Sequence, residues 1–201
     1  MRSIHRIYLP DEDIPIYDYV KNRKLVKYYT RETMAAVIAV SQLFEGHPIP
    51  SDMPFFYSTG ETETLDFYRK ICSEYSQISE EFSSLGFIEN IVPMISPIQQ
   101  FKMMRNTTSC FLSIEYGLKG DNALLLASAS GLLYSAMFAE TKGSVLIGSG
   151  KLYADGTVEC GFAEVLPYEI ENHPMLNSTD DAIALFKTPY FSDNVSSNHR
   201  I

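Results

Sequence analysis

"GLKGDNALLLASASGLL", residues 117–133, holds the turn, the strand and the helix start that decide the fold class. The two glycines that flank Leu-Lys predict a turn. The apolar run from Asn122 to Leu126 then predicts a strand covered on both faces, as in a parallel sheet. Small residues follow at 127–131, and "GLLYSAMF" resumes helical spacing. A strand that passes directly into a helix indicates an α/β protein.

Other segments with helical periodicity surround this block. "TRETMAAVIAVSQLFEG" opens with a capping residue, Thr30, and stops at a glycine, so it predicts a helix that faces the core. Helical spacing also runs through residues 60–82 and 107–116. Residues 86–106 contain two prolines and predict a loop with one or two short helices. "TDDAIALF", residues 179–186, predicts one more short helix.

Extended segments alternate with these helices. "IHRIYL", "MPFFYST" and "SVLIGSG" predict strands at residues 4–9, 53–59 and 144–150. In "KLYADGTVECGFAEVL", Asp155-Gly156 lies between two extended runs and predicts a β-hairpin. This order predicts a layered α/β fold around a mixed or mainly parallel sheet, and the length predicts a single domain over residues 1–201.

Composition excludes several classes of function. The chain carries 16 Lys plus Arg and 25 Asp plus Glu, a formal charge of -9, which repels nucleic acid and anionic membrane surfaces. It has no run of roughly 18 apolar residues and no signal-peptide pattern, so we expect no membrane span and a cytoplasmic location. Cys72, Cys110 and Cys160 are odd in number and far apart, which argues against a disulfide framework or a zinc knuckle. No spacing of histidines or acidic residues predicts a metal site.

"GSGK", residues 148–151, is only a partial match to a phosphate-binding loop. The glycine that the motif needs is replaced by Val145, and Leu152 stands where Ser or Thr would bind magnesium. We therefore expect no nucleotide site.

The small-residue corner at 127–131 has several interpretations. Ser128 stands where a hydrolase elbow would hold its nucleophile, but Leu126 and Ser130 replace the flanking glycines and no histidine lies near it in the sequence. Free N–H groups at a helix start stabilise an oxyanion or lower a thiol pKa. Small residues also allow close packing with no chemistry at all. The residues alone leave a hydrolase, an acyl site and a packing corner open.

The order "MPFFYSTGETET", "PMISP", "SIEYGLKGDNALLLASASGLLYSAMF" and "SVLIGSG" resembles the N-terminal half of the β-ketoacyl synthases. In that family a Gly-Leu-Lys-Gly-Pro-like turn leads into a buried strand that ends at the nucleophilic cysteine. Alignment on the closing Ser-Gly places that cysteine at Ser128, and an ungapped count from Gly120 places it at Ala129. The resemblance implies a thiolase-like half, an α-β-α fold, with residues 151–201 as a divergent tail. It also implies that Ala127, Ala129, Ser130 and Gly131 line a remnant acyl site.

The resemblance also has consequences for activity and partners. The family's cysteine is replaced, and its two catalytic histidines lie in a C-terminal half that this sequence lacks. Ketosynthases dimerise through the strand that leads to the nucleophile, here residues 122–126. Short ketosynthase-like proteins are encoded beside aryl-polyene and polyketide enzymes. We therefore expect a non-condensing accessory subunit without a cofactor, which pairs with a ketosynthase or with itself and acts near an acyl carrier protein or acyl thioester. The alternatives are a serine-dependent acyl transferase or thioesterase that uses Ser128, and a structural protein without a ligand.

Overall fold

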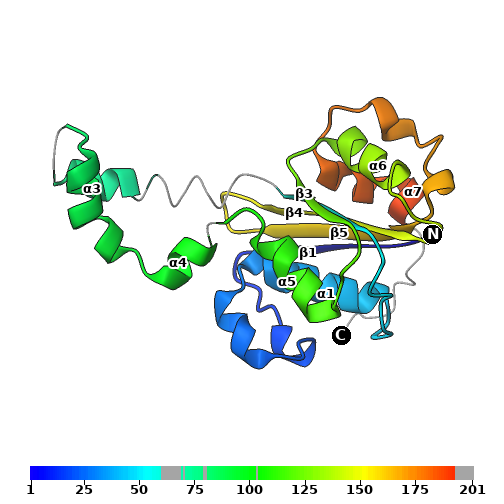
Figure 1. Ribbon diagram of the computed structural model, residues 1–201, viewed down its shortest axis with the longest axis horizontal. Helices are drawn as coiled ribbons and strands as arrows, with labels where there is room; N and C mark the ends of the chain where they lie inside the picture. The colour runs from blue at the N-terminus through cyan, green and yellow to red at the C-terminus, as the bar shows by residue number, and fades with distance from the viewer. Residues whose placement is uncertain (60–68, 70, 79–80, 103, 193–201) are drawn as a thin grey trace.

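The computed structural model describes residues 1–59, 69, 71–78, 81–102 and 104–192. Helices lie on both faces of one central sheet (Figure 1), so the molecule has α-β-α layers. The sheet order is β1-β5-β4-β2-β3. Its strands are β1 (Arg2–Tyr8), β2 (Phe55–Thr59), β3 (Asn122–Leu125), β4 (Val145–Leu152) and β5 (Val158–Val165).

The sheet is mixed, as the sequence predicts. β2 pairs in parallel with β3 and with β4, whereas β5 pairs antiparallel with β1 and with β4. Four strands therefore run in one direction and β5 alone runs against them. The β4–β5 connection is the predicted hairpin, with Gly156 in the left-handed region at φ 91°.

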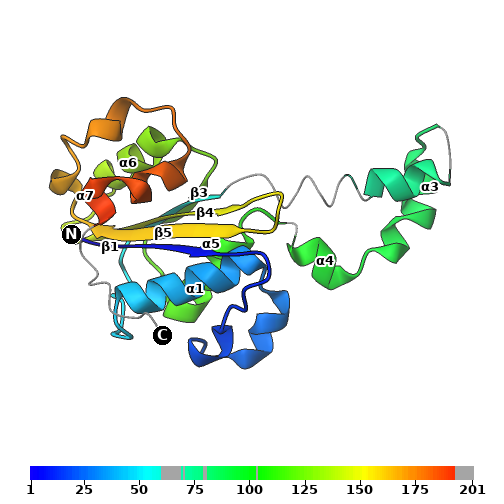
Figure 2. The same ribbon diagram turned by 180° about the vertical axis from the view of Figure 1, so that it is seen from behind.

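One face of the sheet is covered by α1 (Arg31–Leu43) and α5 (Thr107–Tyr116), as Figure 2 shows from behind. α1 begins where the sequence predicts, because the side chain of Thr30 accepts the N–H of Thr33 and caps the helix. Gly117 ends α5 in the left-handed conformation that favours glycine. Two short 3-10 helices, η1 (Ile16–Asp18) and η2 (Arg23–Tyr28), precede α1.

The other face is covered by α6 (Ala129–Met137) and by the C-terminal segments. The predicted short helix at 179–186 is the 3-10 helix η6. This layer packs on one buried apolar cluster, and α1 packs on another on the opposite face. The remaining C-terminal elements are η4 (Pro167–Glu169), η5 (Pro174–Asn177), η6 (Ala182–Lys187) and α7 (Pro189–Ser192).

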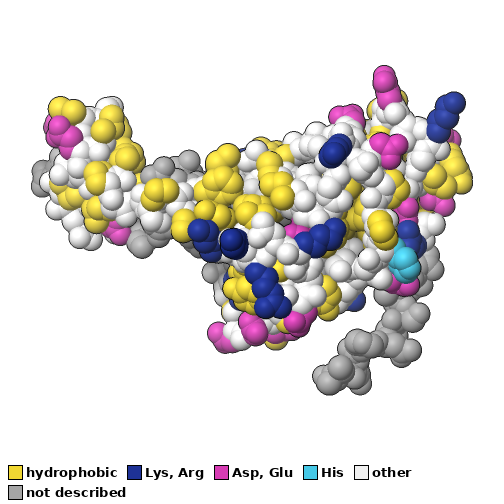
Figure 3. All heavy atoms as spheres, turned by 60° about the horizontal axis from the view of Figure 1, so that its bottom comes forward, with side chains coloured by type: hydrophobic (Ala, Val, Ile, Leu, Met, Phe, Trp, Pro, Cys, Tyr) yellow, Lys and Arg dark blue, Asp and Glu magenta, His cyan; other side chains and the backbone are white. Residues whose placement is uncertain are grey.

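The proline-bearing segment extends away from the sheet as an arm (Figures 1 and 2). It contains α3 (Ser84–Asn90), η3 (Val92–Met94) and α4 (Pro97–Lys102), as expected of a loop with short helices. Hydrophobic side chains gather on the arm in the space-filling view (Figure 3). The exposed large apolar residues of this segment include Phe82, Leu85, Ile88 and Met94. The predicted helix at 60–82 lies partly outside the described residues, and its described part is helical at 71–76.

The predicted strand at 122–126 is covered in part on both faces, because Leu124 packs against one buried cluster and Ala123 and Leu125 pack against the other. β3 is an edge strand, its residues are half-buried or exposed, and Leu126 just beyond it is 60% exposed. An apolar run in the sequence is compatible with a central strand and with an edge strand. The run therefore does not predict how many neighbouring strands pair with it. Among the described residues, no helix is long and apolar enough to cross a bilayer.

Candidate functional site

The corner at 127–131 is a helix start built on the end of β3. Ser128 has extended backbone, φ -68° and ψ 173°, and α6 begins at Ala129. The Ser128 Oγ accepts the N–H of Gly131 at 3.4 Å and lies 2.9 Å from the Oγ of Ser130. The hydroxyl of Ser128 is thus the N-cap of α6, a role that stabilises a helix by about 1 kcal/mol.

The first backbone N–H of this helix is also engaged. The N–H of Ala129 donates to the carbonyl oxygen of Asp180 at 2.8 Å. Ser128 forms an isolated antiparallel bridge with Asp181, the residue that caps η6. The chain's own segment before η6 therefore occupies a donor that an acyl oxyanion would use.

Close packing explains the small residues at the corner. A Cβ added to Gly131 would lie 2.8 Å from the Cβ of Ala127, which is closer than real Cβ atoms approach. The Ser58 Oγ donates to the carbonyl of Ala127 at 3.0 Å, so the chain after β3 is held against the end of β2. Ala129, the first residue of α6, is fully buried. Small side chains at 127, 129 and 131 let helix, strand and loop meet.

The structure brings no described histidine into hydrogen-bond contact with Ser128. His5 binds Glu159, His47 lies 3.0 Å from the carbonyl of Phe44, and His173 accepts the N–H of Met175. His199 lies outside the described residues. A serine hydroxyl without an adjacent base is a weak nucleophile.

The thiols do not supply an alternative nucleophile at the corner. Burial raises the pKa of the Cys160 thiol well above its usual range, so it stays protonated. Cys72 and Cys110 are exposed and free. Within the described ranges, no group of three or more His, Cys, Asp or Glu side chains could hold a metal ion.

The polar centre that sequence reasoning missed surrounds Glu159 in β5. The Glu159 Oε1 lies 2.7 Å from the Nε2 of His5 and 2.8 Å from the Nζ of Lys187. The hydroxyl of Tyr153 donates to the Oε2 of Glu159. The Glu159 side chain is only 3% exposed. We call these four residues, His5, Tyr153, Glu159 and Lys187, the Glu159 cluster.

The Glu159 cluster holds a buried anion. Burial opposes ionisation of Glu159, but hydrogen bonds from Lys187, Tyr153 and His5 outweigh it and hold the pKa of this carboxyl below its ordinary value. Burial and the neighbouring Glu159 carboxylate raise the pKa of the Tyr153 hydroxyl, which stays protonated as a donor. The cluster is therefore an ionised carboxylate surrounded by donors from β1, the hairpin and η6.

A second ion pair joins this cluster to the corner. The Nζ of Lys151 lies 2.6 Å from the Oδ2 of Asp181. Lys151 and Glu159 are directly opposite each other in the β4–β5 register, so both side chains point to the same face of the sheet. η6 is consequently fixed by one ion pair at its start, Asp181–Lys151, and by another at its end, Lys187–Glu159. These two contacts keep the segment at 180–181 against the corner.

A different buried carboxyl, that of Glu32 in α1, lies on the opposite face of the sheet and contacts the end of β2. The Glu32 Oε1 accepts the Tyr57 hydroxyl at 2.5 Å and the Thr59 hydroxyl at 3.1 Å. Burial raises the pKa of Glu32, although both hydrogen bonds act in the other direction. This group stabilises the contact between the first turn of α1 and the central strands.

Comparison with known proteins gives this chain no family. No family model matches the sequence, and no curated protein matches it. Functional inference therefore depends on the residues and contacts described above.

Proposed function

We propose that the chain is a ketosynthase-like accessory subunit of fatty-acid or aryl-polyene-type polyketide biosynthesis that does not itself catalyse condensation. The α-β-α layers and the strand-to-helix corner at 117–131 support the proposal, because the resemblance to the β-ketoacyl synthases implies both. A cytoplasmic location is part of the proposal, because acyl carrier proteins and acyl thioesters are cytoplasmic substrates.

The proposal that the chain does not catalyse condensation rests on the hydrogen bond from the Ala129 N–H to the carbonyl of Asp180. Thioester chemistry at this corner needs free N–H groups for the oxyanion and an activated nucleophile. Here the N–H has a partner within the chain, and the Ser128 hydroxyl caps α6. Both contacts favour a corner that positions chain segments over one that transfers acyl groups.

The proposal that the chain binds a partner subunit is supported by the position of β3 at the edge of the sheet. Exposed apolar side chains also occur on the helices that cover the two faces of the sheet: Ile114 on α5 is 61% exposed, and Phe138, the C-cap of α6, is 77% exposed. Leu126 continues the strand and is exposed as well. An unpaired edge strand is a template for pairing with another chain, and exposed apolar side chains favour such pairing. The occupant that fits the resemblance is a ketosynthase subunit or a second copy.

The net charge constrains how an acyl carrier protein would approach. Carriers of this kind are acidic, and the chain itself has a formal charge of -9. Like charges slow association and weaken docking. We therefore assign carrier binding to the ketosynthase partner.

The first test is intact-mass spectrometry of the purified protein after incubation with acetyl- and malonyl-loaded carrier or with coenzyme A thioesters. The expected result is no acyl adduct on the wild type or on Ser128→Ala. An adduct that forms on the wild type and is absent from Ser128→Ala would overturn the non-condensing assignment. That result would favour the alternative, a serine-dependent acyl transferase or thioesterase.

The second test addresses the partner. Size-exclusion chromatography with light scattering measures the mass of the chain alone and after co-expression with a ketosynthase. Leu126→Lys should abolish the complex, because it places a charge on the β3 edge. The matched control, Ile7→Lys, changes an exposed residue on the opposite edge strand and should leave the mass unchanged. A complex that survives Leu126→Lys but is lost with Ile7→Lys would contradict this assignment, because it would place the interface at β1 and not at β3.

A further inference from the structure

A cavity of about 500 Å³ lies between η1, η2, the first turn of α1 and the end of α4. Binding sites for small molecules have volumes of about 300–1,000 Å³. The buried part of the lining is apolar, because Ile14, Ile16, Val26 and Tyr29 are each at most 7% exposed. Met34 of α1 adds a half-buried apolar side chain. We call this space the η1–η2 cavity.

Four charged side chains also line the η1–η2 cavity. Asp13 and Asp18 come from the segment around η1. Lys27 comes from η2, where its Nζ lies 4.8 Å from the centre of the Tyr28 ring, and the half-buried Lys102 ends α4. In the described part of the chain, none of these four charged groups has an ion-pair partner. The lining therefore holds two anions and two cations that do not neutralise each other by direct contact.

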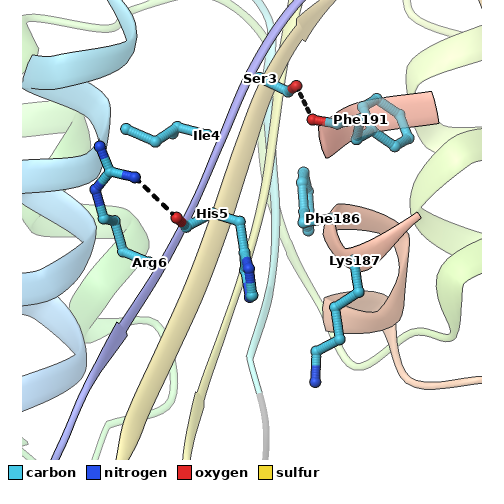
Figure 4. Close-up of a pocket in the computed structure, with 7 residues that line it drawn as sticks. All are labelled: Ser3, Ile4, His5, Arg6, Phe186, Lys187 and Phe191. Atoms are coloured by element: carbon cyan, nitrogen blue, oxygen red, sulfur yellow. Dashed lines mark hydrogen bonds between the residues drawn. The ribbon is translucent and has the colours of Figure 1, made fainter. Parts of the chain in front are cut away.

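The cavity of about 360 Å³ beside β1 differs in this respect (Figure 4). Its polar side chains already have partners within the chain: Ser3 donates to the carbonyl of Phe191, Arg6 donates to that of His5, and His5 and Lys187 contact the Glu159 carboxylate. A ligand there would have to displace these contacts. The η1–η2 cavity needs no such displacement of an ion pair.

The charges of the lining restrict the chemistry of a ligand. A ligand with a single charge would pair with one type of side chain and lie near the like charges of the other type, which weakens binding. A ligand with both an ammonium and a carboxylate pairs with an aspartate and a lysine at once, and hydrogen bonds between charged groups are the stronger class. The buried apolar lining favours a ligand that also buries apolar surface. An amino acid with a large apolar side chain meets all three conditions.

We propose that the η1–η2 cavity binds a free amino acid with a large apolar side chain in its zwitterionic form. The ammonium group contacts Asp13 or Asp18, and the carboxylate contacts Lys27 or Lys102. An aromatic side chain offers about 150–250 Å² of surface for burial against the apolar lining. None of the residues that line this cavity belongs to the corner at 127–131 or to β3. The site therefore adds a ligand to the accessory role proposed above and does not depend on that role.

The first experiment titrates L-phenylalanine into the ¹⁵N-labelled protein and follows the backbone amides by NMR. We expect saturable shifts at residues 13–18 and 26–29. Three control ligands each lack one feature: N-acetyl-L-phenylalanine has no ammonium, L-phenylalanine amide has no carboxylate, and glycine has no apolar side chain. Each control should bind about threefold more weakly or worse, because one charge pair or the apolar contact is lost.

Variants of the protein assign the two charges of the ligand. Lys27→Gln combined with Lys102→Gln should weaken binding of L-phenylalanine by about threefold or more, but should not weaken binding of its amide, which has no carboxylate. Asp13→Asn combined with Asp18→Asn should also weaken binding of L-phenylalanine, but should not weaken binding of the N-acetyl compound, which has no ammonium. A change in overall charge alone would not produce this crossed pattern.

The matched controls are Lys24→Gln and Asp11→Asn. Both change exposed charges on the same two segments, outside the lining of the cavity, and should leave the affinity for L-phenylalanine unchanged. Circular dichroism verifies that each variant is folded.

Several results would overturn the proposal. The first is no binding of L-phenylalanine, or amide shifts confined to residues outside the η1–η2 cavity. The second is binding of the N-acetyl compound or of the amide as tightly as L-phenylalanine. The third is a pair of double variants that bind L-phenylalanine as well as the two controls do. The ligand comparisons use the wild-type protein, so they stay decisive if a double variant does not fold.

Discussion

Gly161→Ala tests whether η6 is seated directly on the sheet. Gly161 lies in β5, and a Cβ added there would lie 2.2 Å from the Cγ of Phe186 and 2.4 Å from its Cβ. Carbon atoms in contact are ordinarily about 3.5–4.0 Å apart. Phe186 is 1% exposed, so its ring has no free space to enter. The methyl group must push η6 away from β5 by more than 1 Å, or about a third of a normal contact distance.

The expected cost follows from this displacement. Overpacking of a well-packed core costs about 1–3 kcal/mol. The same movement separates Lys187 from the buried Glu159 carboxylate, which then keeps only its hydrogen bonds from His5 and Tyr153. We therefore expect the free energy of unfolding to fall by about 3 kcal/mol, at the upper end of the overpacking range.

Urea unfolding followed by circular dichroism measures this loss, and Gly143→Ala is the matched control. Gly143 lies in the loop before β4, where the nearest atom to an added Cβ would be the Oγ1 of Thr141 at 3.6 Å, an ordinary contact. The control should change stability by less than about 0.5 kcal/mol. A Gly161→Ala protein as stable as the Gly143→Ala protein would refute the seating of η6 on Gly161.

Three further outcomes follow from the site. Ser128→Ala should lower the free energy of unfolding by about 1 kcal/mol, because the α6 cap is lost, whereas Ser130→Ala, which keeps the cap, should cost less in the same urea titration. Burial lowers the pKa of His173, so the unfolded chain binds a proton near pH 6.5 before the folded one does; stability should fall as pH drops below about 6.5. His173→Asn, which can still accept the Met175 N–H, should remove that slope, and an unchanged slope would contradict the assignment. Burial raises the pKa of Glu32, so stability should fall as pH rises from about 4.5 through its folded pKa; Glu32→Gln should abolish this dependence while its amide oxygen still accepts the Tyr57 hydroxyl, and a thermal melt series across pH checks it.

Local signals in the sequence identify the elements well. Thr30 before an apolar helical period predicts the start of α1, and the structure confirms it with the cap hydrogen bond to Thr33. Asp155-Gly156 predicts the hairpin, and Gly156 has the positive φ that such turns favour. Both signals act within a few residues, so no tertiary information is needed to recognise them.

Contacts between segments that are far apart in the sequence could not be predicted from it. The apolar run at Asn122–Leu126 gives a strand but not its position at the edge. The contact between Ser128 and Asp181 depends on a chain reversal that no local pattern encodes. One signal for the Glu159 cluster was present: a glutamate between Val158 and Cys160 in the stretch "TVECGFAEVL" must find partners if that strand is buried. The sequence does not say that His5, 154 residues earlier, is one of them.

The pairing of β1 with β5 has a consequence for synthesis of the chain on the ribosome. Arg2 reaches its partner Glu164 across 162 residues, so β1 emerges long before the strand that completes it. Translation at about 5–20 residues per second leaves β1 without that neighbour for roughly ten to thirty seconds. During that interval β4 and β5 are absent, and β1 must be kept from pairing with other nascent chains. Arg2 and Arg6 in β1 favour this, because positive charge on an unpaired strand opposes aggregation with identical copies.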